Sequence, residues 1–180
     1  MGILFISLFT VTGGYLFWQF QANRAIEAFG ADNSKFIWGE ETNIEQELVE
    51  GSRLVIDKIG VSMPLVESRN ESALLYGAWR SPKTSTPDKG GNTVIFGHRY
   101  LNLPPSKNTL FRLNEIKIGD IFEVVWKEET YYYRVTEKFV VEPTQLEVLE
   151  ETEVSTVTLI TCTPLFTTNQ RLIVRGELME

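Results

Sequence analysis

From Arg53 to its end, the chain is a succession of short apolar segments, rich in β-branched and aromatic residues and separated by turn-forming residues. Segments of this kind are typical of β-strands. The clearest of about eight are Arg53–Val61, Met63–Val66, Thr93–Phe96, Ile121–Trp126, Tyr131–Val141, Val157–Thr161 and Arg171–Leu178. Many short strands with few helices favour a barrel, because closure removes unpaired edge strands. We therefore predict a mainly β, eight-stranded domain over residues 52–180.

Between these segments the sequence indicates only two or three short helices. Ser72–Trp79 is interpreted as one or two helical turns, and Thr109–Ile116 as a short helix with an apolar stripe. Gln145–Leu149 is predicted to form a single turn inside a long acidic connection. Ser81–Gly91 is predicted to be a loop, because it is rich in proline and glycine.

The first twenty residues carry no charged side chain. A helix of about twenty apolar residues is about 30 Å long, enough to cross the core of a bilayer. We therefore predict a transmembrane anchor at residues 1–20, followed by a polar, acidic stalk at residues 21–51. The alternative is a cleaved secretory signal with a poor cleavage site at Ala28-Phe29-Gly30.

Charge and the counts of metal-binding residues exclude several function classes. The chain has 17 basic and 24 acidic residues and a net charge of −7, without the basic cluster that nucleic-acid binding requires. One cysteine and one histidine exclude an internal disulfide and an ordinary zinc site. We expect no cofactor, and chemistry that is metal-free or uses ions with oxygen ligands.

The single cysteine, Cys162, ends one predicted strand, and Arg171 begins the next after a polar turn. If the two strands lie side by side, Arg171 comes close to Cys162. A guanidinium beside a thiol favours the thiolate, which is the nucleophilic form. A lone cysteine after such an apolar run is, however, more often an inert buried residue. The spacing alone leaves both roles open.

Two motifs in combination resemble a known family. Thr158–Cys162 (TLITC), followed nine residues later by Arg171 in the run QRLIVRG, resembles the active-site signature of sortases, the membrane-anchored cysteine transpeptidases. Upstream, Val94–Arg99 (VIFGHR) resembles the histidine segment of that family. The resemblance extends from about Arg53 to the C-terminus and implies an eight-stranded sortase-like β-barrel.

The resemblance also assigns roles to three residues. Cys162 would attack the scissile carbonyl as a thiolate. His98, with an ordinary pKa of about 6.5, would protonate the leaving amine and deprotonate the incoming one. Arg171 stays protonated in proteins, so its role is electrostatic. Arg175 is its rival, because it lies four residues further along the same strand face, and Arg99 is expected to be a solvated or supporting residue.

The substrate implied by the resemblance is a secreted protein with a C-terminal sorting motif of the Leu-Pro-x-Thr-Gly or Leu-Ala-x-Thr-Gly type. It would be cut between Thr and Gly, and the acyl group passed to an amine of the cell-wall peptide. A groove is expected beside the three catalytic residues, closed by the Val141–Ser155 connection. Thr161 and Thr163 are candidate peptide contacts, with a packing role equally open for Thr161.

Family membership would place the catalytic domain outside the cell, on a single-pass protein of the cell membrane. The positive-inside rule by itself favours the reverse, since Arg24 and Lys35 follow the apolar span and no basic residue precedes it. The recorded N-terminus is therefore expected to begin late. The sequence contains neither an Asp-Pro-aromatic lid nor a second membrane span, so we expect a cell-wall-anchoring type closer to classes D and E.

The sequence alone leaves three points open: calcium binding, hydrolysis in place of transfer, and a structural role for Cys162. Some sortases bind calcium through acidic loops, but a solvated loop is the simpler interpretation of the carboxylates in the long connection, which are Glu147, Glu150, Glu151 and Glu153. A hydrolytic cysteine protease would use the same residues as a transpeptidase. A membrane-anchored barrel that only binds peptides would leave Cys162 with a structural role.

Overall fold

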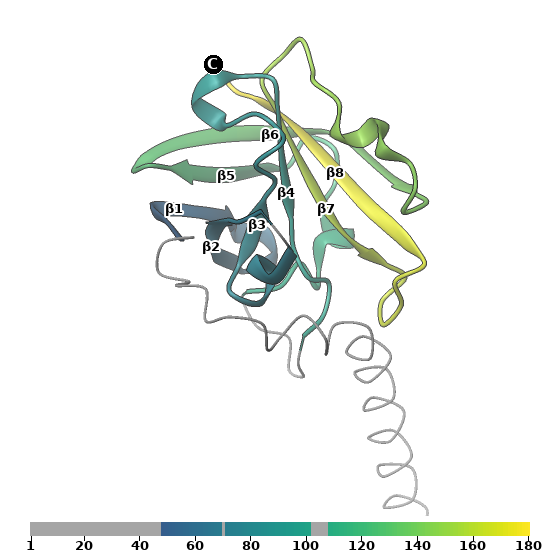
Figure 1. Ribbon diagram of the computed structural model, residues 1–180. Coiled ribbons are helices and arrows are strands. Elements are labelled where there is room, and N and C mark those ends of the chain that lie inside the picture. The colour runs from purple at the N-terminus through teal and green to yellow at the C-terminus, as the bar shows by residue number, and fades with distance from the viewer. Residues whose placement is uncertain (1–47, 70, 102–107) are drawn as a thin grey trace, which may run out of the picture. The chain divides into compact units, whose positions relative to one another are not determined.

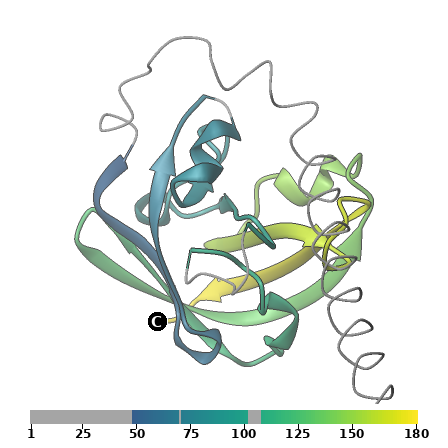
Figure 2. The same ribbon diagram turned by 90° about the horizontal axis from the view of Figure 1, so that it is seen from below.

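The computed structural model describes residues 48–69, 71–101 and 108–180, and eight strands in them form a closed barrel (Figure 1). The strand order is β1-β2-β3-β4-β7-β8-β6-β5, and β5 pairs with β1 to close the sheet. Figure 2 shows the sheet curving round on itself. The strands are β1 (Leu48–Ile56), β2 (Val61–Glu67), β3 (Ala78–Arg80), β4 (Asn92–Phe96), β5 (Ile121–Trp126), β6 (Glu129–Val141), β7 (Thr156–Thr163) and β8 (Gln170–Leu178). The prediction of a mainly β, eight-stranded barrel is confirmed.

The helical segments of the described residues are all 3₁₀ turns of three to five residues. They are η2 (Asp57–Ile59), η3 (Glu71–Leu75), η4 (Pro87–Lys89), η5 (Leu113–Glu115) and η6 (Leu146–Leu149). Among the described residues, no helix is long and apolar enough to cross a membrane. The predicted anchor at residues 1–20 and most of the predicted stalk lie outside the described residues, and the domain boundary at residue 52 stays a prediction.

The predicted strand Arg53–Val61 is shorter at its end than expected, because the turn that Gly60 allows follows Ile56 and Val61 already belongs to β2, which contains the predicted strand Met63–Val66. β1 begins earlier, at Leu48, and ends at Ile56, after which η2 reverses the chain. Gly60 closes this turn in the left-handed conformation, at φ 68°, which glycine adopts without steric penalty. Val61 then pairs with Ile56 in an antiparallel ladder.

The predicted helix Ser72–Trp79 is wrong in its second half. Helical structure ends at Leu75, and Ala78 to Arg80 form β3. This short strand pairs in parallel with β2 and antiparallel with β4, so it joins the two halves of the barrel. Its Trp79 ring stacks on Phe96 of β4, with 5.1 Å between centroids. Tertiary packing therefore overrides local propensity here.

The predicted helix Thr109–Ile116 shortens to η5, although its apolar stripe is buried as expected, with Leu110 and Leu113 at 0% and Ile116 at 1% exposure. The predicted turn within Gln145–Leu149 is confirmed as η6. It lies in the long connection between β6 and β7, residues 142–155, which we call the β6–β7 connection.

Two apolar layers lie on opposite faces of β4, β7 and β8. The interior of the barrel holds Ile95, Leu159, Leu172 and Val174, whose neighbours in sequence point outward. The outer layer consists of Val94, Ile160 and Ile173 together with Val141 and Val148. This alternation follows from the two-residue period of a strand. The outer face of these strands is therefore buried beneath the β6–β7 connection.

Asn92 at the start of β4 fastens the connection in place. Its side chain is fully buried and donates to the carbonyls of Val148 (3.1 Å) and Glu150 (2.8 Å). Its Oδ1 accepts a hydrogen bond from Thr158 Oγ1 at 2.8 Å, and its backbone N–H donates to Glu151 Oε2 at 3.2 Å. Every polar group of this buried amide thus has a partner, which favours one position of η6 over the sheet.

Candidate active site

Cys162 and Arg171 lie directly opposite each other on neighbouring strands. The antiparallel register of β7 and β8 pairs Cys162 with Arg171 and Thr163 with Gln170. The β-carbons of such opposite residues are about 4.5–5.5 Å apart. The adjacency that the spacing predicted is confirmed, because the loop of residues 164–169 brings the chain straight back along β7.

His98 reaches the same place from a third strand. β4 runs parallel to β7, with Phe96 paired to Ile160, and the Gly97 N–H continues the ladder to the Ile160 carbonyl at 3.0 Å. Continuing this register two residues past Phe96 brings His98 level with Cys162. Phe96 and Ile160 both belong to the outer layer, so the continued register predicts His98 beside Cys162, past the end of β4 and close to the end of the adjacent strand β7 (Figure 1).

The segment after β4 is held by close packing around Gly97. The His98 carbonyl accepts a hydrogen bond from the Leu110 N–H at 2.8 Å. A methyl group added at Gly97 would lie only 2.7 Å from Leu110 Cδ1, closer than carbon atoms approach without a shift. Glycine is therefore favoured immediately before His98, because a larger residue would require the buried Leu110 side chain to shift.

Burial and positive charge act in opposite directions on the Cys162 thiol. Desolvation raises its pKa above the ordinary value, while the guanidinium groups of Arg171 and Arg99 work against that rise. Desolvation also lowers the pKa of His98, by disfavouring the imidazolium. The neutral thiol and neutral imidazole are therefore the major form near neutral pH, and the charged pair is a minor one.

The register distinguishes the two candidate arginines. Arg171 faces Cys162, and its Nη1 donates to the carbonyls of Thr168 at 2.8 Å and Gln170 at 3.1 Å. Arg175 faces Thr158 instead. Its Nη1 lies 3.1 Å from a carboxylate oxygen of Glu137, and its guanidinium lies 5.5 Å from the centre of the Phe139 ring.

This difference predicts unequal effects of two otherwise similar substitutions. Arg171→Ala should lower kcat/KM for a sorting-motif peptide by roughly 10²-fold or more, the scale of losing a group that stabilises an oxyanion. Arg175→Ala, the matched control on the same strand face, should leave kcat/KM within a few-fold, because it removes only a partly exposed ion pair. Steady-state kinetics on the two purified variants is the measurement. A severe loss in Arg175→Ala with a mild one in Arg171→Ala would mean that the proposed roles are reversed.

The two candidate peptide contacts differ in their surroundings. Thr161 is only 2% exposed, and its Oγ1 donates to the Gly97 carbonyl at 2.8 Å. This bond ties β7 to the segment that carries His98 and supports the packing role, while a peptide contact at Thr161 stays a prediction. Thr163 is half-buried beside Cys162 and stays a candidate contact.

Of the two roles expected for Arg99, solvated or supporting, the structure contradicts the first, because Arg99 is only 7% exposed. Its Nη2 donates to Asn114 Oδ1 at 2.7 Å. The sequence offers no signal for this burial, since an arginine after His98 at a strand end would ordinarily be solvated. Sequence reasoning therefore missed a second positive charge near Cys162.

An aromatic cluster also joins the His98 segment to the β7–β8 loop. The Tyr100 ring meets Phe166 edge-on, with centroids 4.9 Å apart, and lies 6.4 Å from Phe111. Aromatic pairs in such geometry add to the stability that buried area alone provides. The cluster holds the loop that follows Cys162 against the segment that follows His98. The three rings come from separate parts of the chain, so no local sequence pattern predicts this aromatic cluster.

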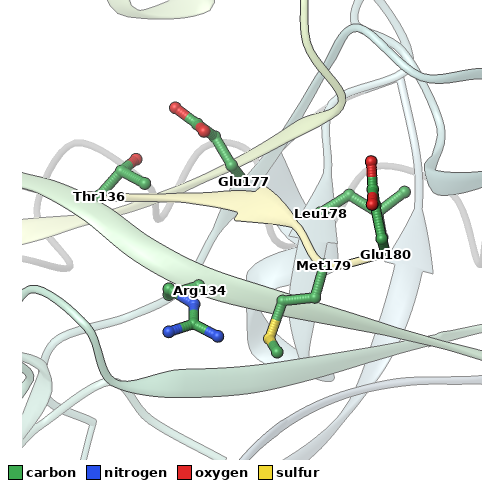
Figure 3. Close-up of a pocket in the computed structure, with 6 residues that line it drawn as sticks. All are labelled: Arg134, Thr136, Glu177, Leu178, Met179 and Glu180. Carbon is green, nitrogen blue, oxygen red and sulfur yellow. The ribbon is translucent and has the colours of Figure 1, made fainter.

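None of the three residues lines either of two surface cavities. One, of about 350 Å³, is lined by Arg134, Thr136, Glu177, Leu178, Met179 and Glu180 (Figure 3). Glu177 pairs with Thr156, at the opposite end of β7 from Cys162, so this cavity is far from the chemistry. The other, of about 310 Å³, lies beneath the β6–β7 connection and is lined by Phe139, Val141, Gln145, Glu147, Val148 and Arg175. The groove expected beside Cys162 stays a prediction.

Calcium binding by the acidic connection also stays untested. Within residues 48–69, 71–101 and 108–180, no group of three or more histidine, cysteine or acidic side chains is arranged to hold a metal ion. Of the four glutamates considered, Glu151 accepts the hydrogen bond from the Asn92 backbone. That bond gives Glu151 a structural part in holding the connection.

Comparison with known proteins agrees with this arrangement. A family model described as the sortase domain matches residues 54–179. The chain is 30% identical to Sortase A of Bacillus anthracis over 71% of its own length and 59% of that protein. It is 28% identical to Sortase SrtE1 of Streptomyces coelicolor, over 89% of its length and 48% of that protein. The chain thus spans about half to three fifths of these relatives.

Solved structures show the same architecture. The crystal structure of sortase C-1 from Actinomyces oris superposes with a TM-score of 0.64 at 33% identity, over 72% of this chain and 73% of that one. The family model and the barrel topology therefore agree with the family that the sequence motifs resemble.

Proposed function

The chain belongs to the sortase family, and we propose that it is a cysteine transpeptidase that cleaves a C-terminal sorting motif and transfers the upstream protein to an amine. The observation that carries this proposal is the strand register. It pairs Cys162 with Arg171 and, continued past β4, predicts His98 beside Cys162. A nucleophile, a proton carrier and a fixed positive charge are what acyl transfer requires.

In the first half of the reaction, the Cys162 thiolate attacks the carbonyl carbon of the scissile peptide bond, while the proton lost by the thiol resides on His98. Negative charge develops on the carbonyl oxygen, and Arg171 stabilises it. The carbon–nitrogen bond then breaks, and the His98 imidazolium gives its proton to the departing amine. The product is a thioester between Cys162 and the upstream part of the substrate.

In the second half, an amine attacks the thioester carbonyl and passes a proton to His98. The carbon–sulfur bond breaks, the Cys162 thiolate leaves, and a new amide links the substrate to the acceptor. Water in place of the amine would give hydrolysis with the same residues. Transfer therefore depends on how well the acceptor competes with water, which is why the protease alternative stays testable.

We propose further that the substrates are secreted proteins with a Leu-Pro-x-Thr-Gly or Leu-Ala-x-Thr-Gly motif, cut between Thr and Gly, and that the acceptor is a cell-wall peptide amine. The apolar run at residues 1–20 supports a single-pass protein of the cell membrane with its catalytic domain outside. A cell-wall-anchoring type closer to classes D and E is proposed from the absence of a lid motif in the sequence.

The active form requires charged Cys162 and charged His98, whereas burial favours the neutral form of each, and this predicts a bell-shaped pH profile. The active form needs Cys162 deprotonated and His98 protonated, yet burial raises the pKa of the first and lowers that of the second. As the pH rises, activity should increase when the pair of Cys162 and His98 loses its first proton and decrease when it loses its second. Between these two steps the rate should form a wide plateau, on which only a small fraction of the enzyme molecules is in the active form. The two limbs belong to the coupled pair, not to single residues. Measurement of kcat/KM from about pH 5 to about pH 10 checks this, and a profile without a falling limb would contradict it.

The function itself is tested by offering a sorting-motif peptide with and without an amine such as diglycine. We expect the upstream product to carry the added amine when it is present, as detected by chromatography and mass spectrometry. Cleavage whose product never carries the amine would favour the hydrolytic protease. Binding without any cleavage, together with an unreactive Cys162, would favour a peptide-binding barrel.

A further inference from the structure

Two arginines of the described chain are buried, and their surroundings differ sharply. Arg80, at 5% exposure, forms an ion pair with Glu67 and donates to the carbonyls of Ser81, Thr84 and Ser85. Its guanidinium also lies 5.6 Å from the centre of the Trp126 ring. The charge of Arg80 is thus fully compensated, as burial of an ion normally requires.

Arg99, at 7% exposure, lacks such compensation. Among the described residues, only its Nη2 has a partner, the neutral amide oxygen of Asn114. Its Nε and Nη1 are buried and have no acceptor among the described residues, and no carboxylate of those residues forms an ion pair with it. A buried guanidinium in this state is destabilising unless a negative charge forms next to it.

Cys162 is the group near Arg99 that can supply that charge. The pKa of Arg99 is lowered by burial and raised by Cys162, the one ionisable group that acts on it. The interaction is mutual, because Arg99 in turn opposes the rise in the pKa of Cys162. Arg99 also lies in the short segment after β4 that is bonded to the end of β7, through the Gly97 N–H to the Ile160 carbonyl at 3.0 Å and through Thr161 Oγ1 to the Gly97 carbonyl at 2.8 Å.

The other charged groups around Cys162 do not replace this pairing. β8 contributes Arg171, and the segment after β4 contributes His98 as well as Arg99. The β7–β8 loop, residues 164–169, has no charged side chain. From the β6–β7 connection, Glu142 accepts a hydrogen bond from Gln170 Nε2 at 2.9 Å, so it pairs with the neighbour of Arg171 instead of with Arg99.

We propose that Arg99 is a second cationic group of the active site, a positioning residue that serves as the buried counter-ion of the Cys162 thiolate. The inference rests on the proposed role of Cys162 as the nucleophile. Arg171 is half-buried and lies opposite Cys162, and in the proposed mechanism its charge stabilises the oxyanion. Arg99 is buried and bonded to Asn114. Its positive charge stabilises the Cys162 thiolate in the free enzyme and again when the thioester breaks and the thiolate leaves.

The test is the pH dependence of Cys162 alkylation in the full-length chain, kept in detergent. Iodoacetamide is uncharged, and Cys162 is the only cysteine, so the mass of the protein reports the reaction at one atom. The variants are Arg99→Gln and Arg99→Met, with Arg171→Gln as a second charge removal near the sulfur. Arg175→Gln is the control, because Arg175 lies on the same strand but faces Thr158.

We expect alkylation of both Arg99 variants to be roughly tenfold slower at neutral pH, with the midpoint of the profile moved to higher pH, as for loss of a neighbouring opposite charge. Arg175→Gln should keep the profile of the unmodified chain. Removing a buried cation that lacks a carboxylate should not weaken the fold. We therefore expect Arg99→Met to be at least as stable to urea as the unmodified chain at a pH where Cys162 is a thiol.

Each contrary outcome has a separate meaning. If the Arg99 variants keep the original profile while Arg171→Gln shifts it, the proposal for Arg99 is wrong and the proposed function stands. If both Arg99 variants fail to fold or are markedly less stable, Arg99 is a structural residue and the proposal is again wrong. If Cys162 of the unmodified chain is unreactive at every pH, the proposed function itself fails.

Discussion

Replacing Cys162 with alanine is expected to slow cleavage of a sorting-motif peptide by about 10⁶-fold if the nucleophile behaves as in other covalent acyl-transfer enzymes. The reason is that the chain holds one thiol and the proposed mechanism passes through a covalent bond to it. The barrel should stay folded, because Cys162 is half-buried at the end of β7 and the substitution removes one sulfur atom. Peptide cleavage and thermal unfolding of the same preparation are the two measurements.

The activity and the unfolding temperature of Cys162→Ala together distinguish a catalytic role from a packing role. Loss of activity together with a lowered unfolding temperature would leave a packing role for Cys162. Full loss of activity with an unchanged unfolding temperature is the predicted combination. Cleavage at more than a small fraction of the original rate would contradict the account, since it would require a nucleophile elsewhere in the chain.

Replacing His98 is expected to lower kcat/KM by roughly 10²- to 10⁴-fold, the contribution of general acid–base catalysis. No second histidine exists to take over proton transfer. His98→Ala and His98→Gln should both lose activity across the whole pH range. Glutamine fills similar space and forms hydrogen bonds but does not carry a proton, so its variant separates proton transfer from packing.

The result that would refute this role is near-normal cleavage by His98→Ala at its pH optimum. Cys162 would then work with another proton carrier. Activity in His98→Gln but not in His98→Ala would assign His98 a packing role. Kinetics of the two variants against the unmodified chain, measured over the same pH range, decides among these outcomes.

The strand pattern made the barrel predictable, but not all of its members. Long segments such as β6 and β8 are predictable as strands because they are rich in β-branched and aromatic residues. β3 does not, because Ala78–Arg80 is three residues long and its preceding sequence favours helical turns. It is a strand because β2 and β4 each offer it a hydrogen-bonding edge, which is tertiary information that a local pattern does not contain.

The site was predictable to the extent that its residues are close in sequence. Cys162 and Arg171 are joined by a short loop, so an antiparallel pairing follows almost directly from their spacing. The position of His98 depends on the parallel pairing of β4 with β7, which connects strands separated by two others in sequence. The motif resemblance supplied what spacing did not, and the structure supplied the burial of Thr161 and Arg99.

The mass of the intact protein, recorded within seconds of mixing with a sorting-motif peptide, tests the central proposal most directly. The account predicts a transient increase equal to the peptide's acyl portion, located on Cys162 by fragmentation and removed on addition of diglycine, with the acyl–diglycine product appearing in step. Hydroxylamine, which cleaves thioesters, should also remove it. Peptide cleavage with no adduct on Cys162 at any time, and with none in a slow His98→Gln variant, would contradict the covalent mechanism.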